Sequence, residues 1–277
     1  MYYCFMNLEP KKPLCVIIPF RFGNQDLPNK NIIEIHSRSL FHRSLNHALL
    51  LKSFINLQIC LSTNRPELIF EVRELSEKFD HLERPIDLKN RLISSGFGID
   101  LHVRNSKLSS KKSPVSDTVN DIRQAYLNLD MNFQNWLLLQ PTSPFRSKAD
   151  IKIIAKYLKQ NKSNKKSLIS VTNVNGNHPT RMYSEKNGKL LSLSGIDKLR
   201  RDRRQDLEDI YIRDGGFYLF SDSLADKKKL FSENPDFFVR KYPWNINIDT
   251  RYDLAAALSI EEIEVRNDPN NKLQNKN

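Results

Sequence analysis

The chain has 277 residues, of which 39% are hydrophobic and 27% are charged, with 13 prolines and 8 glycines. This composition predicts one large or two small globular domains, and it excludes disordered, collagen-like and disulfide-scaffold proteins. The net charge of +12 favours a polyanionic partner, such as nucleic acid, an anionic membrane or a small molecule that carries phosphate.

The cysteines and the apolar runs indicate the cellular compartment of the protein. Cys4, Cys15 and Cys60 have neither zinc-type nor disulfide-type spacing, which favours reduced thiols. The apolar run at 14–20 is far shorter than the roughly 18 residues that cross a bilayer. Residues 1–13 lack the continuous apolar core of a signal peptide. We therefore expect a cytoplasmic protein without a membrane partner.

The first part of the chain alternates short β-branched runs with segments of helical periodicity. In chain order, we expect strands at 14–20, 57–62, 99–103, 135–139 and 167–172, and helices at 39–54, 65–79, 117–129 and 149–160. Strands that alternate with helices predict an α/β fold with a mostly parallel central sheet and helices on both faces.

The alternation breaks between 178 and 214, where short extended pieces mix basic and acidic residues. We interpret this excursion, about 177–212, as a small dimerisation arm of a single domain that spans 14–266. The remaining expectations are strands at 216–220, 237–242 and 244–248, a helix at 252–265, surface loops at 81–95 and 109–114, an N-terminal extension at 1–13 and a disordered tail at 267–277.

Candidate binding residues follow the expected strands, where ligands bind in open α/β sheets. The loop 21–31 reads RFGNQDLPNKN, and its Arg21, Lys30 and amide groups suit a triphosphate. It lacks the Walker pattern, and an ordinary surface connection is the alternative interpretation. Arg104 follows the third expected strand.

Two further segments are polar at the ends of strands. The turn 140–146 reads QPTSPFR, and its two prolines stiffen a polar surface; alternatively, it only connects a strand to a helix capped by Ser147. Alternation places Asn247 and Asp249 on one side of the last strand, where a carboxylate could hold Mg²⁺. The alternative is that Asp249 or Thr250 caps the next helix.

Taken together, these segments resemble a known family. The sequences IPFR and LPNKN, FGIDLHVR, LLQPTSPFR, RRQDL with DGGFY, and INIDT occur in the family's order across 14–262. They resemble the acylneuraminate cytidylyltransferases, also called CMP-sialic acid synthetases, and fit the Kdo cytidylyltransferases less well. The resemblance implies a glycosyltransferase-A-like nucleotidyltransferase fold and a homodimer. It also implies transfer of CMP from CTP to an acidic nine-carbon 2-keto sugar, with Mg²⁺ as cofactor.

The resemblance also implies a role for individual residues. Arg21, Lys30 and Asp249 would be catalytic. The implied nucleotide-binding residues are Arg21, Asn24, Gln25, Lys30, Asn31 and Arg104; the implied sugar-binding residues are Gln140, Arg181, Arg204 and Tyr218; the implied metal ligands are Asp249 and Asn247. Arg181 and Arg204 occupy positions that the family sends across the dimer interface.

Some positions depart from the family pattern. Phe20, Asn24 and Gln25 stand where Ala, Ser and Lys are usual, Asn247 replaces an Asp, and Asp214 stands where Asn is usual. These departures leave open a relative that binds nucleotide or sugar without turnover. A nucleic-acid-binding module rests on charge alone, and we expect no nucleic-acid partner because no RNA-binding motif or zinc finger is present. N-acetylneuraminate, legionaminate, pseudaminate and Kdo-like sugars stay open as substrates.

Overall fold

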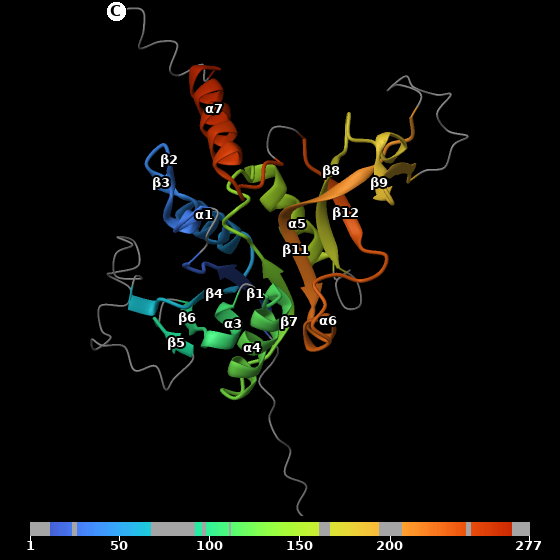
Figure 1. The fold of residues 1–277 in the computed structure, drawn as a ribbon. Coiled ribbons are helices and arrows are strands. Elements are labelled where there is room, and N and C mark those ends of the chain that lie inside the picture. The colour runs from blue at the N-terminus through green and yellow to red at the C-terminus, as the bar shows by residue number, and fades with distance from the viewer. Residues whose placement is uncertain are drawn as a thin grey trace, which may run out of the picture.

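A computed structural model describes residues 12–23, 27–67, 92–95, 98–110, 112–160, 167–193, 207–241 and 245–267. Within these residues, eight strands form one sheet in the order β12-β8-β11-β7-β1-β4-β6-β5 (Figure 1). The strands are β1 (Lys12–Pro19), β4 (Gln58–Thr63), β5 (Leu92–Ser94), β6 (Ile99–Val103), β7 (Phe133–Leu138), β8 (Leu168–Asn173), β11 (Tyr211–Ser221) and β12 (Asp236–Val239).

The centre of the sheet is parallel. Strand β1 pairs in parallel with β4 and β7, β4 with β6, and β8 with β12, whereas β11 and β5 run antiparallel to their neighbours. Parallel neighbours require crossovers over the faces of the sheet, which the helices supply. The predicted mostly parallel α/β sheet is confirmed.

Helices cover both faces of the sheet and complete two cores. The alternation of β1 sends Leu14, Val16 and Ile18 to one face and Cys15 and Ile17 to the other. The first core is closed by α1 (Leu40–Lys52) and α5 (Lys148–Lys159), and the second by α4 (Val115–Leu127) and α6 (Asp222–Asp226). Both faces of the central strands are therefore apolar, as the run at 14–20 predicted.

The remaining elements are short or lie at the periphery. They are η1 (Lys30–Ile32), β2 (Glu34–Ile35), β3 (Arg38–Ser39), α3 (Ser106–Ser109), η5 (Pro179–Arg181), β9 (Tyr183–Lys186), β10 (Lys189–Ser192) and α7 (Arg251–Asn267). The hairpin β9–β10 lies beside the ends of β8 and β11 (Figure 1). No helix in the described ranges is long and apolar enough to cross a bilayer.

Several predicted boundaries shift in the structure, most of all the start of β11, and one predicted strand is wrong. Strand β1 begins at Lys12, within the predicted extension, and β11 begins at Tyr211 rather than at 216. The strand predicted at 244–248 is absent from its described part, 245–248. Instead, the amide of Ile248 donates to the carbonyl of Thr142 at 2.7 Å, so this segment is tied to the turn after β7.

One further prediction differs from the structure, one is confirmed, and others fall outside the described residues. The segment 81–95, predicted as a loop, contains β5, which pairs with β6 because its backbone continues the sheet edge. Ser147 caps α5 as expected, since its Oγ accepts from the amide of Asp150 at 3.1 Å. Most of the helix predicted at 65–79 lies outside the described residues, as do 268–277 of the predicted tail and Cys4. Cys15 and Cys60 are buried and are not disulfide-bonded.

Candidate active site

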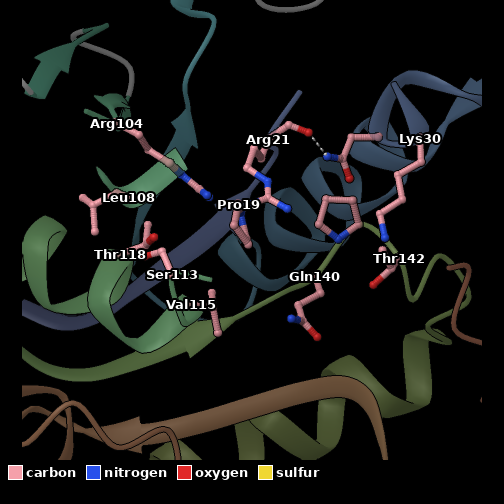
Figure 2. A pocket seen from close by; sticks show the side chains of 12 residues that line it. Pro19, Arg21, Lys30, Arg104, Leu108, Ser113, Val115, Thr118, Gln140 and Thr142 are labelled. Atoms are coloured by element: carbon pink, nitrogen blue, oxygen red, sulfur yellow. Dashed lines mark hydrogen bonds between the residues drawn. The ribbon is translucent and has the colours of Figure 1, made fainter. Parts of the chain in front are cut away.

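A cavity of about 210 Å³ opens beyond the carboxyl ends of β1, β6 and β7 (Figure 2). Its lining residues are Pro19, Arg21, Lys30, Asn31, Arg104, Leu108, Ser113, Val115, Thr118, Gln140, Pro141 and Thr142. Five of the predicted site residues are in this set. In Figure 2, the side chains of Arg104, Arg21 and Lys30 lie along one rim, with Gln140 across from them. The cavity therefore combines three cationic side chains with a neutral amide.

Arg21 and Asn31 fix the two ends of the loop that follows β1. The guanidinium of Arg21 donates from Nη1 to the carbonyls of Ser109 and Ser110, at 3.2 and 2.7 Å. The buried Asn31 donates from Nδ2 to the carbonyl of Arg21 at 2.8 Å (Figure 2). The hydrogen bond from Asn31 to Arg21 closes the loop. The bonds to Ser109 and Ser110 hold the Arg21 side chain between the loop and α3.

Arg104 reaches the same cavity from the end of β6. Its Nε donates to Oγ of Ser62 at 2.9 Å, and its Nη2 donates to the Ser62 carbonyl at 3.3 Å. Burial, and then the nearby charge of Arg21, lower the pKa of Arg104 to about 10. The guanidinium still carries its charge at neutral pH, and two cations facing one cavity favour an anionic ligand.

Lys30, Asp249 and Asn247 meet at the edge of the cavity. The ammonium of Lys30 lies 2.7 Å from Oδ1 of Asp249, and Asn247 donates from Nδ2 to Oδ2 of the same carboxylate at 2.7 Å. Asn247 in turn accepts from Oγ of Ser143 at 3.3 Å. The carboxylate is 59% exposed, so this ion pair contributes little to stability and can exchange partners when a ligand binds.

The donor set fits a Mg²⁺ ion that arrives with a triphosphate. Mg²⁺ commonly takes one or two protein carboxylates and fills its other positions with water and substrate phosphates. Asp249 supplies one exposed carboxylate, whereas Asn247 presents its amide nitrogen to that carboxylate. Among the described residues, no three His, Cys, Asp or Glu side chains gather as a potential metal site. A metal here therefore depends on oxygens from the substrate.

Arg146 holds the turn after β7 against two other elements. Its Nε donates to the carbonyl of Gly216 and its Nη2 to that of Gln140, both at 2.8 Å, and its Nη1 to Oγ of Ser44 at 3.2 Å. Burial, and then the charge of Arg240, lower the pKa of Arg146 to about 9. The sequence does not predict this role, because the partners Gly216 and Ser44 are far from Arg146 along the chain.

The backbone of β11 passes close to the turn at Gly215, which has φ +75°. A Cβ at this position would lie 3.2 Å from Oγ of Ser143 and 3.6 Å from Oε1 of Gln140. Glycine permits both the left-handed backbone and this close approach. The DGG sequence therefore brings β11 against the polar turn.

Asp214 is a structural residue rather than part of the cavity. Its buried carboxylate accepts from Nη1 of Arg240 at 3.0 Å and from the amide of Gly216 at 2.9 Å, and it is hydrogen-bonded to Ser170. The Asp that stands where the family usually has Asn therefore balances a buried arginine. This departure has no direct bearing on the chemistry of the cavity.

Other predicted site residues lie away from this cavity or outside the described ranges. Tyr218 stacks on Phe231, with ring centroids 6.3 Å apart, and does not line the cavity. Arg181 is in η5, beside the β9–β10 hairpin, and does not line it either. Asn24, Gln25 and Arg204 fall outside the described residues.

Comparison with curated proteins identifies sugar cytidylyltransferases as relatives. The N-acylneuraminate cytidylyltransferase of Streptococcus agalactiae is 25% identical over 249 residues, covering 89% of this chain and 52% of that protein. The pseudaminic acid cytidylyltransferase of Campylobacter jejuni is 27% identical over 254 residues, covering 91% and 97%. The CMP-N,N'-diacetyllegionaminic acid synthase of Legionella pneumophila is 24% identical over 258 residues, covering 90% and 97%.

The chain thus spans about half the length of the Streptococcus relative and nearly all of the other two. No family model matches the chain. The resemblance inferred from the ordered motifs is confirmed by these relatives, because each aligns over most of the chain.

Solved structures confirm the fold. The structure of CMP:2-keto-3-deoxy-manno-octonic acid synthetase, a complex with CTP, matches with a TM-score of 0.56 at 10% identity, covering 91% of this chain and 99% of that chain. The 4-diphosphocytidyl-2C-methyl-D-erythritol synthase of Anaerococcus prevotii matches with a TM-score of 0.53 at 15% identity, covering 91% and 96%. The nucleotidyltransferase fold predicted from the motifs is therefore observed.

Proposed function

We propose, from the relationship to the sugar cytidylyltransferases, that this chain transfers CMP from CTP to a sialic-acid-like 2-keto acid sugar and releases pyrophosphate. One observation carries the proposal: Arg21, Lys30 and Arg104 line a single cavity at the carboxyl ends of the parallel strands, opposite Gln140. A triphosphate and an acidic sugar both need such positive charge. The absence of a disulfide-type cysteine pattern supports a reducing, cytoplasmic setting.

The reaction requires alignment and charge neutralisation more than covalent chemistry by the protein. The anomeric hydroxyl of the sugar attacks the α-phosphorus of CTP, and the bond to the β-phosphate breaks as pyrophosphate leaves. Arg21 and Lys30 would bind phosphate oxygens, with Lys30 exchanging Asp249 for the ligand. When bound, Mg²⁺ would neutralise further phosphate charge from Asp249. Asn31 and Arg104 would contact the cytidine, since both line the cavity.

The sugar would lie on the Gln140 side of the cavity. Gln140 offers a neutral amide there. We propose that Arg181, Arg204 and Tyr218 contribute to this side when two chains assemble. A guanidinium suits the sugar carboxylate because it forms two parallel hydrogen bonds.

We also propose a homodimer, formed through the arm. Several large apolar side chains are exposed on the hairpin β9–β10 and on the neighbouring ends of β11 and β12. They are Tyr183, Leu190, Leu191, Leu193, Tyr211, Ile212, Phe237 and Val239. An exposed apolar surface of this kind is typical of an interface between proteins.

The proposal is tested by CTP binding together with pyrophosphate release. Calorimetry should show CTP binding that Lys30→Ala weakens by about tenfold or more, because a charge-assisted phosphate contact is lost. Lys152→Ala, which removes a solvent-exposed lysine on α5, is the matched control. Failure of the wild-type chain to bind CTP would refute the proposal.

A second candidate is a relative that binds nucleotide without turnover. The observation that favours it is the single carboxylate at the cavity edge, whose two oxygens are already occupied by Lys30 and Asn247. Tight CTP binding with no pyrophosphate release from any 2-keto acid sugar would support this candidate.

A further inference from the structure

A continuous chain of hydrogen bonds runs from the cavity into the protein behind it. Oγ of Ser62, on β4, accepts from Nε of Arg104 at 2.9 Å and lies 3.0 Å from Nδ1 of His102, on β6. Nε2 of His102 lies 2.8 Å from Oδ2 of Asp121, on α4. These hydrogen bonds thus connect the neighbouring strands β4 and β6 with the covering helix α4, and Arg104 is their end at the cavity.

With His102 neutral and Asp121 ionised, the chemistry of the four groups gives every bond one direction. A guanidinium only donates, so Ser62 accepts from Arg104 and has its own hydroxyl proton left for Nδ1 of His102. His102 must then carry its proton on Nε2, where it donates to the carboxylate of Asp121. Donation therefore passes in one direction, from Arg104 through Ser62 and His102 to Asp121.

The Ser–His–Asp set is not a nucleophilic triad. The side chains of Ser62 and His102 have no exposed surface, and Oγ of Ser62 is already bonded to Arg104. A substrate cannot approach that hydroxyl. Of these four residues, Arg104 is the one that lines the cavity. The other three can therefore act on a ligand through the position of the Arg104 guanidinium.

We propose that Ser62, His102 and Asp121 are positioning residues that orient Arg104 toward the nucleotide. This inference rests on the proposed function, in which Arg104 contacts the cytidine. Arginine has many rotamers, and immobilising it during binding costs affinity. A hydrogen-bonded chain that holds the guanidinium before the ligand arrives removes part of that cost. Asp121 sits at the far end and does not line the cavity.

The test uses substitutions at Asp121, whose carboxylate is 22% exposed on α4, so that folding is not at risk. Asp121→Ala should raise the Kd and KM for CTP by about fivefold to tenfold, as expected for the loss of one typical hydrogen bond. The sugar KM and kcat should change by less than about twofold, because the perturbation acts on one ligand. Asp121→Asn should restore CTP affinity, since its Oδ1 can accept from Nε2 of His102.

Asp117→Ala is the matched control. It removes a carboxylate one turn earlier on the same helix, where Oδ1 of Asp117 lies 3.1 Å from the ammonium of Lys228. It should leave the Kd for CTP unchanged. A second pair of variants tests Ser62, which lies between Arg104 and His102. Ser62→Ala should weaken CTP binding as Asp121→Ala does, and Ser62→Thr, which keeps the hydroxyl, should not. Thermal melting of each variant confirms that it is folded.

Two outcomes would overturn this inference alone, and they differ from failure of the proposed function. Unchanged CTP affinity in Asp121→Ala, beside a wild-type chain that binds CTP, would refute the positioning role alone. An equal rise of both substrate KM values would also refute it, because that result indicates a general structural loss. A wild-type chain that binds no CTP would refute the proposed function and this inference with it.

Discussion

Replacement of Asp214 by Asn tests whether the buried charges are arranged as the structure has them. The side chain of Asp214 has no exposed surface and that of Arg240 is 1% exposed, with Oδ2 and Nη1 3.0 Å apart. Asp214→Asn keeps the shape and one acceptor oxygen but removes the charge. It leaves a buried guanidinium without its main counter-ion.

The expected cost follows from this geometry. Removing one partner of a buried ion pair costs about 3–5 kcal/mol. Asp150, 3.5 Å from Nε of Arg240, supplies some remaining negative charge, which places the expected loss near the lower end. With a urea m-value of about 3 kcal/mol/M for a domain of this size, the unfolding midpoint should fall by about 1 M.

The assay is urea unfolding of the wild-type chain and three variants. Asp209→Asn is the matched control, because Asp209 makes an exposed hydrogen bond with Asn173 and should cost less than about 0.5 kcal/mol. Arg240→Met in the Asp214→Asn background should recover part of the loss, since no buried charge is then left unpaired. A midpoint shift below about 0.3 M in Asp214→Asn would refute the reasoning.

Three further predictions address pH, metal and assembly. Burial, and then the charge of Arg146, lower the pKa of His47 from 6.5 to about 3. Because the unfolded histidine binds a proton below pH 6.5 and the folded one does not, the free energy of unfolding should fall as the pH falls, by about 1.4 kcal/mol per pH unit between pH 6 and about 3. His47→Gln should flatten this slope in urea titrations. Asn247→Asp places two carboxylates together, so the Mg²⁺ concentration for half-maximal turnover should fall, whereas Asn245→Asp should not change it. Leu190→Glu with Leu193→Glu should convert a dimer to a monomer in sedimentation, unlike Leu129→Glu at another exposed leucine.

The fold and much of the cavity could be predicted because their signals are local. Short β-branched runs and helical periodicity fixed the order of the elements. Arg21, Arg104 and Gln140 each follow a strand of the parallel centre, and the carboxyl ends of such strands converge. Their meeting in one cavity follows from topology, without knowledge of any individual contact.

The wrong strand and the displaced boundary have simple physical reasons. The alternation in WNINI is the same in a strand and in an extended segment, and the structure pairs Ile248 with Thr142 rather than with a strand. Strand β11 was predicted too short because Asp214, Gly215 and Gly216 are unfavourable in strands. In the structure, the irregular pairing between Arg213 and Tyr218 accommodates them.

The buried polar contacts could not be predicted, because they depend on residues far apart in the sequence. Arg146 and Arg240 are ordinary arginines in the sequence, and only the assembled sheet places them beneath the turn and opposite Asp214. The contact of Arg104 with Ser62 likewise requires β4 and β6 to be neighbours. Such contacts have no periodic signal along the chain.

The most direct test of the central claim is to detect the CMP-sugar itself. The chain is incubated with CTP, Mg²⁺ and one 2-keto acid sugar at a time, and products are measured by mass spectrometry alongside pyrophosphate. We predict equimolar CMP-sugar and pyrophosphate with at least one nine-carbon acidic sugar, and loss of both in Lys30→Ala. Folded protein that binds CTP yet forms no CMP-sugar with N-acetylneuraminate, legionaminate, pseudaminate or Kdo would contradict the account.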